Sequence, residues 1–279
     1  MRLSIIIVNW NTTGLLKTLL KSIETHAPAC DCEVIVVDNA SDGFDGNSLK
    51  SEFPSVQLIA NSANYGYARG NNQALALAQG DYVLLLNPDT EVTEGAIDAL
   101  VAFMDSHPDA AAAGSKLVRP DGTIDRSVRS FPYPGPIAWE YMGLSRLFPK
   151  SRTLGAYRMT YFKYDCVAEV DQPMGSCLIL GRAALNEVGI LDERFPIFFN
   201  EVDWLYRAYK IGYKIYFTPD ATIIHHGGAG TGQIDKRKMR RESHESLLRF
   251  YNKHFRGKIP APVYWLVVAC IRVNMSIRG

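Results

Sequence analysis

Leu3-Ser4-Ile5-Ile6-Ile7-Val8, followed by Asn9-Trp10-Asn11, is the stretch that decides the fold. Its β-branched, almost uninterrupted apolar residues are typical of a strand that is buried on both faces, as in a parallel sheet. Further apolar runs alternate with segments whose apolar residues recur at helical spacing: strands at 34–37, 56–60 and 82–86, helices at 15–23, 71–78 and 94–105. This alternation predicts an α/β fold with a Rossmann-like, mostly parallel nucleotide-binding sheet flanked by helices.

Polar clusters follow three of these strands, at residues 9–11, 38–42 and 87–89. Ligands of such sheets bind beyond the carboxyl ends of the strands. We therefore expect the three clusters to converge on one crevice.

Length and composition restrict the class of protein. The chain has 279 residues, 47% of them apolar and 21% charged, which predicts an ordinary globular protein and excludes a disulfide scaffold, a fibre and a largely disordered chain. The formal net charge of +1 provides no field that would attract nucleic acid, so we expect no nucleic-acid partner. The five cysteines are scattered and no secretory signal is evident, which favours reduced thiols and a cytoplasmic location.

The middle of the chain is less regular. The proline-rich residues 131–136 predict a loop or lid that continues to about residue 164, because proline fixes φ and removes a hydrogen-bond donor. Beyond it the patterns predict further strands and helices: strands at 167–170, 177–180, 213–217 and 221–224, helices at 182–188 and 201–211.

The C-terminal part is basic and then apolar. Residues 236–258 contain nine Lys or Arg and two Glu, a local charge of +7, and an aromatic and apolar segment follows at 262–268. This composition suits a helical extension that lies on an anionic membrane surface through residues 236–272, but a helix docked on the domain or a homodimer contact fits it equally well. The longest apolar stretch, residues 261–271, is too short to span a bilayer.

Two of the strand-end carboxylates are candidates for ligand binding. Asp89 ends a buried strand, where it would hold Mg²⁺ or Mn²⁺ or, alternatively, cap the following helix. Asp38 would accept a hydrogen bond from a base or ribose, or else form a local Asx turn. The glycines and amides of residues 64–72, with Arg69 among them, suit a diphosphate at a helix start.

Two later clusters are candidates for catalysis or metal binding. Glu201 and Asp203 lie at a predicted helix start behind aromatic residues, where burial would raise a pKa and suit a general base; acids that merely stabilise the helix N-terminus are the alternative. His225 ends an apolar strand and would complete a metal site or be structural, and the glycine-rich residues 227–230 after it would allow a mobile flap.

Taken in order, these segments resemble inverting glycosyltransferases of family 2, and within them the rhamnosyltransferase-like members of bacterial polysaccharide assembly. The resemblance covers roughly residues 3–255 and rests on seven motifs: Val8-Asn9-Trp10-Asn11, Val36-Val37-Asp38-Asn39-Ala40-Ser41, Asn64-Tyr65-Gly66-Tyr67-Ala68-Arg69-Gly70-Asn71, Leu86-Asn87-Pro88-Asp89, Gly175-Ser176-Cys177-Leu178, Asn200-Glu201-Val202-Asp203-Trp204 and Ile224-His225-His226-Gly227-Gly228. It implies a GT-A fold with a catalytic domain at 1–235, divided at about residue 116 into a nucleotide-sugar half and an acceptor half (117–235), and a helical extension at 236–279.

The resemblance also implies a role for each matching residue. Nucleotide-sugar binding falls on Asn9, Asn11, Asp38, Asn64, Gly66, Arg69 and Asn87; metal binding on Asp89 and His225; the catalytic acids on Glu201 as base and Asp203 as its orienting partner; and the acceptor or sugar loop on Gly175, Ser176 and Trp204. Many relatives carry a third acid where this chain has Asn200, which argues against Asn200 as the base.

The implied reaction transfers a sugar, such as the deoxyhexose rhamnose, from a dTDP- or UDP-linked donor to a hydroxyl of a saccharide or lipid-linked saccharide, with Mg²⁺ or Mn²⁺ as cofactor. Two alternatives remain. A nucleotidyltransferase would also use a parallel sheet and an acidic metal site, but it is expected to have a Gly-rich basic loop after the first strand, which residues 9–13 lack. A catalytically inactive sugar- or membrane-binding protein of the same fold would not need the acids and His225 together.

Overall fold

The structure is a computed structural model that describes residues 1–228, 232 and 235–278. Its strands are β1 (Leu3–Asn9), β2 (Cys32–Asp38), β3 (Gln57–Ala60), β4 (Tyr82–Leu86), β5 (Thr90–Val92), β6 (Ala110–Val118), β7 (Val128–Arg129), β8 (Ala168–Glu169), β9 (Gln172–Pro173), β10 (Cys177–Gly181) and β11 (Lys214–His225). Its helices are α1 (Thr13–Thr25), α2 (Gly46–Glu52), α3 (Tyr67–Leu75), α4 (Ala96–Ser106), α5 (Pro134–Tyr141), α6 (Leu144–Leu147), α7 (Arg182–Val188), α8 (Asn200–Lys210), α9 (Lys236–His254) and α10 (Ala261–Arg278).

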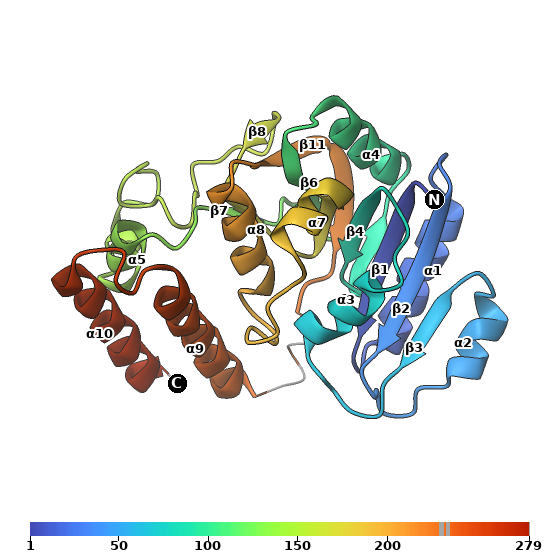
Figure 1. Cartoon of the computed structure of the whole chain (residues 1–279), viewed down its shortest axis with the longest axis horizontal. Coiled ribbons are helices and arrows are strands. Elements are labelled where there is room, and N and C mark those ends of the chain that lie inside the picture. Colours follow the sequence, from blue (N-terminus) through green and yellow to red (C-terminus); the bar gives the residue numbers. More distant parts are fainter. Residues whose placement is uncertain (229–231, 233–234, 279) are drawn as a thin grey trace.

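One large sheet with helices on both faces forms the centre of the molecule (Figure 1). Its strand order is β3-β2-β1-β4-β10-β6-β11-β5, with β8 also paired to β11. The pairs from β3 to β4 and the pair β6–β11 are parallel, whereas β10 is antiparallel to both of its neighbours. The predicted α/β fold with a mostly parallel sheet is confirmed.

The register of the sheet aligns the strand ends that carry the polar clusters. Asn9 at the end of β1 pairs with Asp38 at the end of β2, and Ile7 pairs with Leu86 at the end of β4. The residues after these strands therefore emerge at one edge of the sheet, as expected for parallel neighbours.

The sequence patterns missed the nine-residue strand β6. Its first residues, 110–114, are four alanines and a glycine, which have low strand propensity. They nevertheless form a strand because β10 on one side and β11 on the other complete their backbone hydrogen bonds within the sheet. The two strands expected at 213–217 and 221–224 are one strand, β11, with a register shift between Thr218 and Thr222.

The loop or lid expected at 131–164 is wrong for the part that forms α5 and α6. Pro134 and Pro136 lie in the first turn of α5, where the backbone N–H groups have no partner within the helix. Proline at these positions removes nothing that the helix needs. The proline-rich stretch thus starts a helix rather than preventing one.

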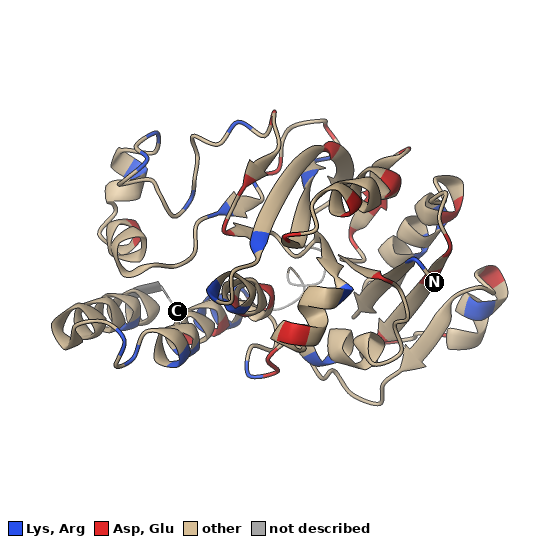
Figure 2. Cartoon of the chain, turned by 45° about the horizontal axis from the view of Figure 1, so that its top comes forward, with Lys and Arg blue, Asp and Glu red and all other residues tan. Residues whose placement is uncertain are grey.

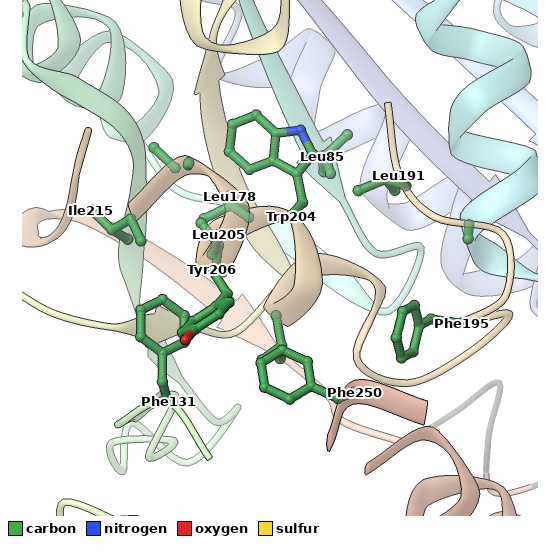
Figure 3. Close-up of a cluster of buried hydrophobic side chains, with 14 of the residues drawn as sticks. Leu85, Phe131, Leu178, Leu191, Phe195, Trp204, Leu205, Tyr206, Ile215 and Phe250 are labelled. Carbon is green, nitrogen blue, oxygen red and sulfur yellow. The ribbon is translucent and has the colours of Figure 1, made fainter. Parts of the chain in front are cut away.

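The C-terminal helices pack onto the same core as the sheet. Trp204 and Tyr206 of α8 are buried between β-sheet residues such as Leu178 and the aromatic ring of Phe250 from α9 (Figure 3). Ile271 of α10 belongs to the same buried cluster. Figure 1 shows α9 and α10 side by side next to α5, and α10 packs against both. The helical extension, α9 and α10, therefore packs into the same hydrophobic core as the sheet.

Candidate active site

A cavity of about 970 Å³ lies at the carboxyl ends of β1 and β4 and extends to α5, α6 and α9. Trp10, Asn39 and Asp89 line it, one from each of the three polar clusters that follow the strands. The predicted convergence of these clusters is confirmed. Such concave spaces at the ends of parallel strands are the usual location of ligand sites in this class of sheet.

Asp89 and His225 face one another in this cavity. The Nε2 atom of His225 lies 3.6 Å from Oδ1 of Asp89 and 3.2 Å from Oγ of Ser176. On the other side of the ring, Nδ1 lies 2.8 Å from Oδ2 of Asp125, whose second carboxylate oxygen accepts a hydrogen bond of 3.0 Å from Arg119. The ring is thus held between a carboxylate behind it and the cavity in front of it.

Asp89 and His225 together suit a divalent cation whose remaining coordination positions are filled by a substrate. Their facing oxygen and nitrogen atoms are 3.6 Å apart, close enough to share one ion. Within the described residues no group of three or more His, Cys, Asp and Glu side chains is arranged to hold a metal ion. Two protein ligands leave coordination positions for phosphate oxygens and water, as Mg²⁺ and Mn²⁺ prefer.

Asp125 was missed by the sequence interpretation. It ends a short hairpin in which its N–H donates to the carbonyl of Leu117 and Gly122 occupies the left-handed region at φ 80°. This hairpin is 100 residues from His225 in the chain. Nothing in the local sequence connects the two, so their pairing is visible only in the folded chain.

Glu201 lies in the cavity lining at the start of α8. Burial raises the pKa of its carboxyl above the ordinary value, and backbone hydrogen bonds and the positive charge of Arg129 oppose the rise only in part. Phe199, just before α8, has a left-handed backbone with φ 68°, which is strained for an aromatic residue and typical of functional sites. Gly175 also fits here, because a Cβ at this position would meet Cγ of Glu201 at 3.3 Å.

Asp203 and Trp204 lie outside the cavity lining. Asp203 is fully buried and accepts hydrogen bonds from His254 at 2.7 Å, Lys253 at 2.8 Å and Arg207 at 2.9 Å. Trp204 is a core residue whose indole N–H donates to the carbonyl of Gly189 at 2.7 Å. Both residues therefore fix the position of α8, on which Glu201 lies.

Asn9 and Asp38 form a hydrogen-bonded pair behind the cavity wall. The amide of Asn9 donates to Oδ1 of Asp38 at 2.7 Å, and both the N–H and the hydroxyl of Ser41 donate to the same carboxylate. The Asx-turn alternative for Asp38 is thus present in the structure. Asn11, with φ 53°, donates from its N–H to Oγ of Ser41 and so joins the two strand ends.

The segment before α3 places only some of its predicted residues in the cavity. Asn64 and Gly66 line it, and Gly66 (φ 84°) lies so close to Pro196 that a Cβ would be 2.9 Å from the carbonyl oxygen of that proline. Arg69 is exposed, and its guanidinium stacks on the ring of Tyr65 at 4.3 Å. Arg69, which was predicted to bind a diphosphate, therefore lies outside the cavity lining.

Asn87, Ser176 and Gly175 connect the metal candidates to Glu201. The amide of Asn87 donates to Oγ of Ser176 at 3.1 Å, and Ser176 in turn contacts His225. Gly175 and Ser176 both line the cavity. These predicted residues are brought together by the pairing of β4 with β10.

Three further lining residues were absent from the candidate site. The hydroxyl of Ser127 and the amide oxygen of Gln172 are buried and have no hydrogen-bond partner among the described residues. Arg129 lies on β7, next to β9, which carries Gln172. Unsatisfied buried polar atoms in a cavity wall are suited to hydroxyl groups of a ligand. Of the predicted glycine flap, residues 229 and 230 lie outside the described residues.

Comparison with known proteins identifies the family of the chain. The family model described as glycosyl transferase family 2 matches residues 4–166. An N-acetylglucosaminyl-diphospho-decaprenol L-rhamnosyltransferase of Mycobacterium tuberculosis is 28% identical over 271 residues, which cover 92% of this chain and 84% of the relative. The dTDP-rhamnosyl transferase RfbF of Shigella flexneri is 22% identical, over 74% of this chain and 64% of its own length.

Solved structures show the same fold. A mannosyltransferase of Pyrobaculum calidifontis in complex with GDP-Man and Mn²⁺ has a TM-score of 0.63 at 16% identity, covering 98% of this chain and 69% of that chain. TarS 1–349 of S. aureus has a TM-score of 0.58 at 17% identity, covering 99% and 81%. The fold is therefore of the GT-A type, and the chain belongs to glycosyl transferase family 2.

Proposed function

We propose that this protein is a metal-dependent, inverting glycosyltransferase that moves a deoxyhexose such as rhamnose from a dTDP- or UDP-linked donor to a hydroxyl of a saccharide or lipid-linked saccharide in cell-surface polysaccharide synthesis. The observation that carries the proposal is that the half-buried carboxylate of Glu201 and the pair Asp89–His225 line the same cavity. One base and one cation site are what this reaction requires.

In the proposed reaction the carboxylate of Glu201 takes the proton of the acceptor hydroxyl. The acceptor oxygen attacks the anomeric carbon from the face opposite the diphosphate, and the bond between that carbon and the diphosphate oxygen breaks, with its electron pair leaving on the diphosphate. The configuration at the anomeric carbon inverts. The raised pKa of Glu201 suits this role, because a base whose pKa is nearer to neutrality accepts a proton more readily.

Asp89 and His225 would hold the cation, and Asn87 and Ser176 line the cavity beside them. A bound Mg²⁺ or Mn²⁺ supplies positive charge that neutralises the leaving diphosphate. We assign the nucleotide to the end of the cavity formed by Trp10, Asn39, Asn64 and Gly66, with Asn9, Asn11 and Asp38 holding that wall in place. The transferred sugar would lie near the unsatisfied atoms of Ser127 and Gln172.

Asp203, Trp204 and Arg69 have supporting roles in this proposal. Asp203 orients the base by anchoring α8 to α9, and Trp204 anchors the same helix to the core. Arg69 contacts Tyr65 and would reach the donor only if its side chain moved.

An acceptor linked to a lipid would place this protein at a membrane surface in the cytoplasm. Within the described residues no helix has the length and apolarity that crossing a bilayer requires. One face of α10 packs on α5 and α9, whereas Trp265, Leu266 and Val273 are exposed on another. These residues, beside the basic helix α9, suit contact with headgroups of an anionic membrane, through residues 236–272.

A panel of nucleotide sugars tests the function. Purified protein is combined with Mn²⁺ and each of dTDP-rhamnose, UDP-glucose, UDP-GlcNAc and GDP-mannose, and both thermal stabilisation and release of the nucleoside diphosphate are measured. We expect stabilisation and slow hydrolysis with a dTDP- or UDP-linked sugar, abolished by EDTA. Absence of both effects with every donor would contradict the proposal.

A further inference from the structure

The charges that line the cavity are separated between its two ends. Asp89 and Glu201 lie at the end formed by the sheet, together with Arg129, whose charge acts on Glu201. At the other end the lining contains Arg146, Arg158 and Arg240, against one carboxylate, Glu140. We call this second region, together with His244, the cationic end. In Figure 2 the part of the ribbon that carries α5 and the C-terminal helices shows more blue than red.

The side chains of the cationic end are arranged around α5. The Nε atom of Arg158 donates to both carboxylate oxygens of Glu140, at 2.8 and 2.9 Å, and the charge of Arg146 also acts on this carboxylate. The ring of His244, from α9, lies 5.8 Å from that of Tyr141. With one carboxylate for three guanidinium groups, this end keeps an excess of positive charge.

An apolar surface adjoins the cationic end. Leu147 and Phe148 follow Arg146 directly and are 73% and 52% exposed. On the other side, Asn274 of α10 lines the cavity, and its neighbour Val273 is 54% exposed. A ligand whose anionic group binds the arginines would therefore find an apolar surface immediately outside the cavity.

We infer that the cationic end binds the diphosphate of a prenyl-diphosphate-linked acceptor, with the hydrocarbon chain leaving over Leu147, Phe148 and α10. The inference rests on the proposed function and adds the site that holds the acceptor's anionic group. Guanidinium groups bind phosphate oxygens in charge-assisted, bidentate hydrogen bonds. The saccharide on the diphosphate then extends toward Glu201.

The donor's own diphosphate is the competing occupant of the arginines. Its expected position is the opposite end, where the two carboxylates of Asp89 and Glu201 outnumber the one guanidinium of Arg129 and repel phosphate unless a metal ion lies between them. The cationic end attracts phosphate without a metal ion. Dependence on metal therefore distinguishes the two diphosphates.

Binding of farnesyl diphosphate, followed by tryptophan fluorescence in EDTA without any donor, tests the inference. We expect farnesyl diphosphate to bind at least tenfold more tightly than farnesol, and Arg146→Gln and Arg240→Gln each to weaken it by about tenfold or more, the scale of a charged hydrogen bond. Arg241→Gln is the matched control, because Arg241 is the next residue on α9 but pairs with Glu245 at 2.9 Å and is not in the lining. It should leave binding unchanged.

A second arm measures dTDP binding in the presence of Mn²⁺. If the inference holds, Arg146→Gln and Arg240→Gln bind dTDP as the unmodified protein does. Unchanged affinity for farnesyl diphosphate in both variants, or a loss of dTDP binding of the same size, would overturn it. Because neither arm requires turnover, failure of the nucleotide-sugar panel and failure of this inference are separate results.

Discussion

Oδ2 of Asp125 lies 2.8 Å from Nδ1 of His225, and on the opposite side of the imidazole ring Nε2 faces Asp89. A carboxylate that accepts from one ring nitrogen fixes the tautomer and leaves the other nitrogen unprotonated for a metal ion. Asp125 lies outside the predicted motifs, but through His225 it should control the affinity of the site for the metal ion.

We therefore expect Asp125→Asn to weaken Mn²⁺ binding about 10–100-fold, the usual effect of removing a carboxylate behind a ligating histidine. Free Mn²⁺ is measured by electron paramagnetic resonance in the presence of dTDP. Asp121→Asn is the control. Asp121 lies in the same hairpin, but its carboxylate accepts hydrogen bonds from the N–H and the hydroxyl of Thr123 within the turn. Equal Mn²⁺ affinity in the two variants, at equal thermal stability, would show that Asp125 has no influence on the site.

Glu201→Gln should lower kcat by about 10²-fold or more, because the amide cannot accept the acceptor's proton. Donor affinity, measured by calorimetry, should stay within about twofold. Since burial raises the pKa of Glu201, the acidic limb of the kcat profile of the unmodified protein should have its midpoint above about 4.3, the ordinary value for glutamate. Glu187→Gln, at an exposed carboxylate of α7, should change neither quantity. A normal kcat with weakened donor binding would instead assign Glu201 to donor binding.

Asp203→Asn should lower the free energy of unfolding by about 3 kcal/mol, because it leaves Lys253, Arg207 and His254 facing a neutral group in a largely buried site. Urea denaturation measures the change. The more exposed pair of Lys17 and Glu52 provides the comparison, since Glu52→Gln should cost less than about 1 kcal/mol. A stable Asp203→Asn variant with greatly reduced kcat would indicate direct catalysis by Asp203.

The carboxylates of Asp203 and Asp192, both of which accept hydrogen bonds from Lys253, predict a loss of stability in acid. Burial by itself raises the pKa of Asp203, but the hydrogen bonds from His254 and Lys253 outweigh it and hold the pKa below its ordinary value. Hydrogen bonds from Arg194 and Lys253 likewise lower the pKa of Asp192. A depressed pKa in the folded state stabilises the fold above the pKa of the unfolded chain, about 3.9, and the contribution is lost as the pH falls through the folded-state value. Unfolding curves below pH 4 should therefore shift more for the unmodified protein than for Asp203→Asn.

Trp265 and Leu266 should carry the membrane contact. In a sedimentation assay with vesicles of 30% anionic lipid at low salt, the double variant Trp265→Ser, Leu266→Ser should bind at least tenfold more weakly, because two exposed apolar side chains no longer enter the headgroup region. Ile190→Ser removes a similarly exposed apolar side chain between α7 and α8 and should bind as before. If the unmodified protein does not sediment with these vesicles, the membrane contact is wrong.

The sequence by itself determined the parallel part of the sheet formed by β1, β2 and β4, and with it the position of the ligand site. The apolar runs of β1, β2 and β4 can only be satisfied by burial on both faces, and the polar residues after them must then meet at one edge. The motif that contains Glu201 is also visible in the sequence, because an acid at the first turn of a helix is a local pattern.

Tertiary structure decided the remaining strands and the role of each acidic side chain, because both depend on contacts between residues far apart in the chain. β6 is a strand because β10 and β11 hydrogen-bond to it, not because its alanines prefer that conformation. Glu201 and Asp203 lie two residues apart in the same helix-start motif, yet Glu201 lines the cavity whereas Asp203 is enclosed by Arg207, Lys253 and His254 from α8 and α9. A local pattern specifies which side chain is present, whereas burial and neighbouring charge, which only the packed chain provides, decide what that side chain does.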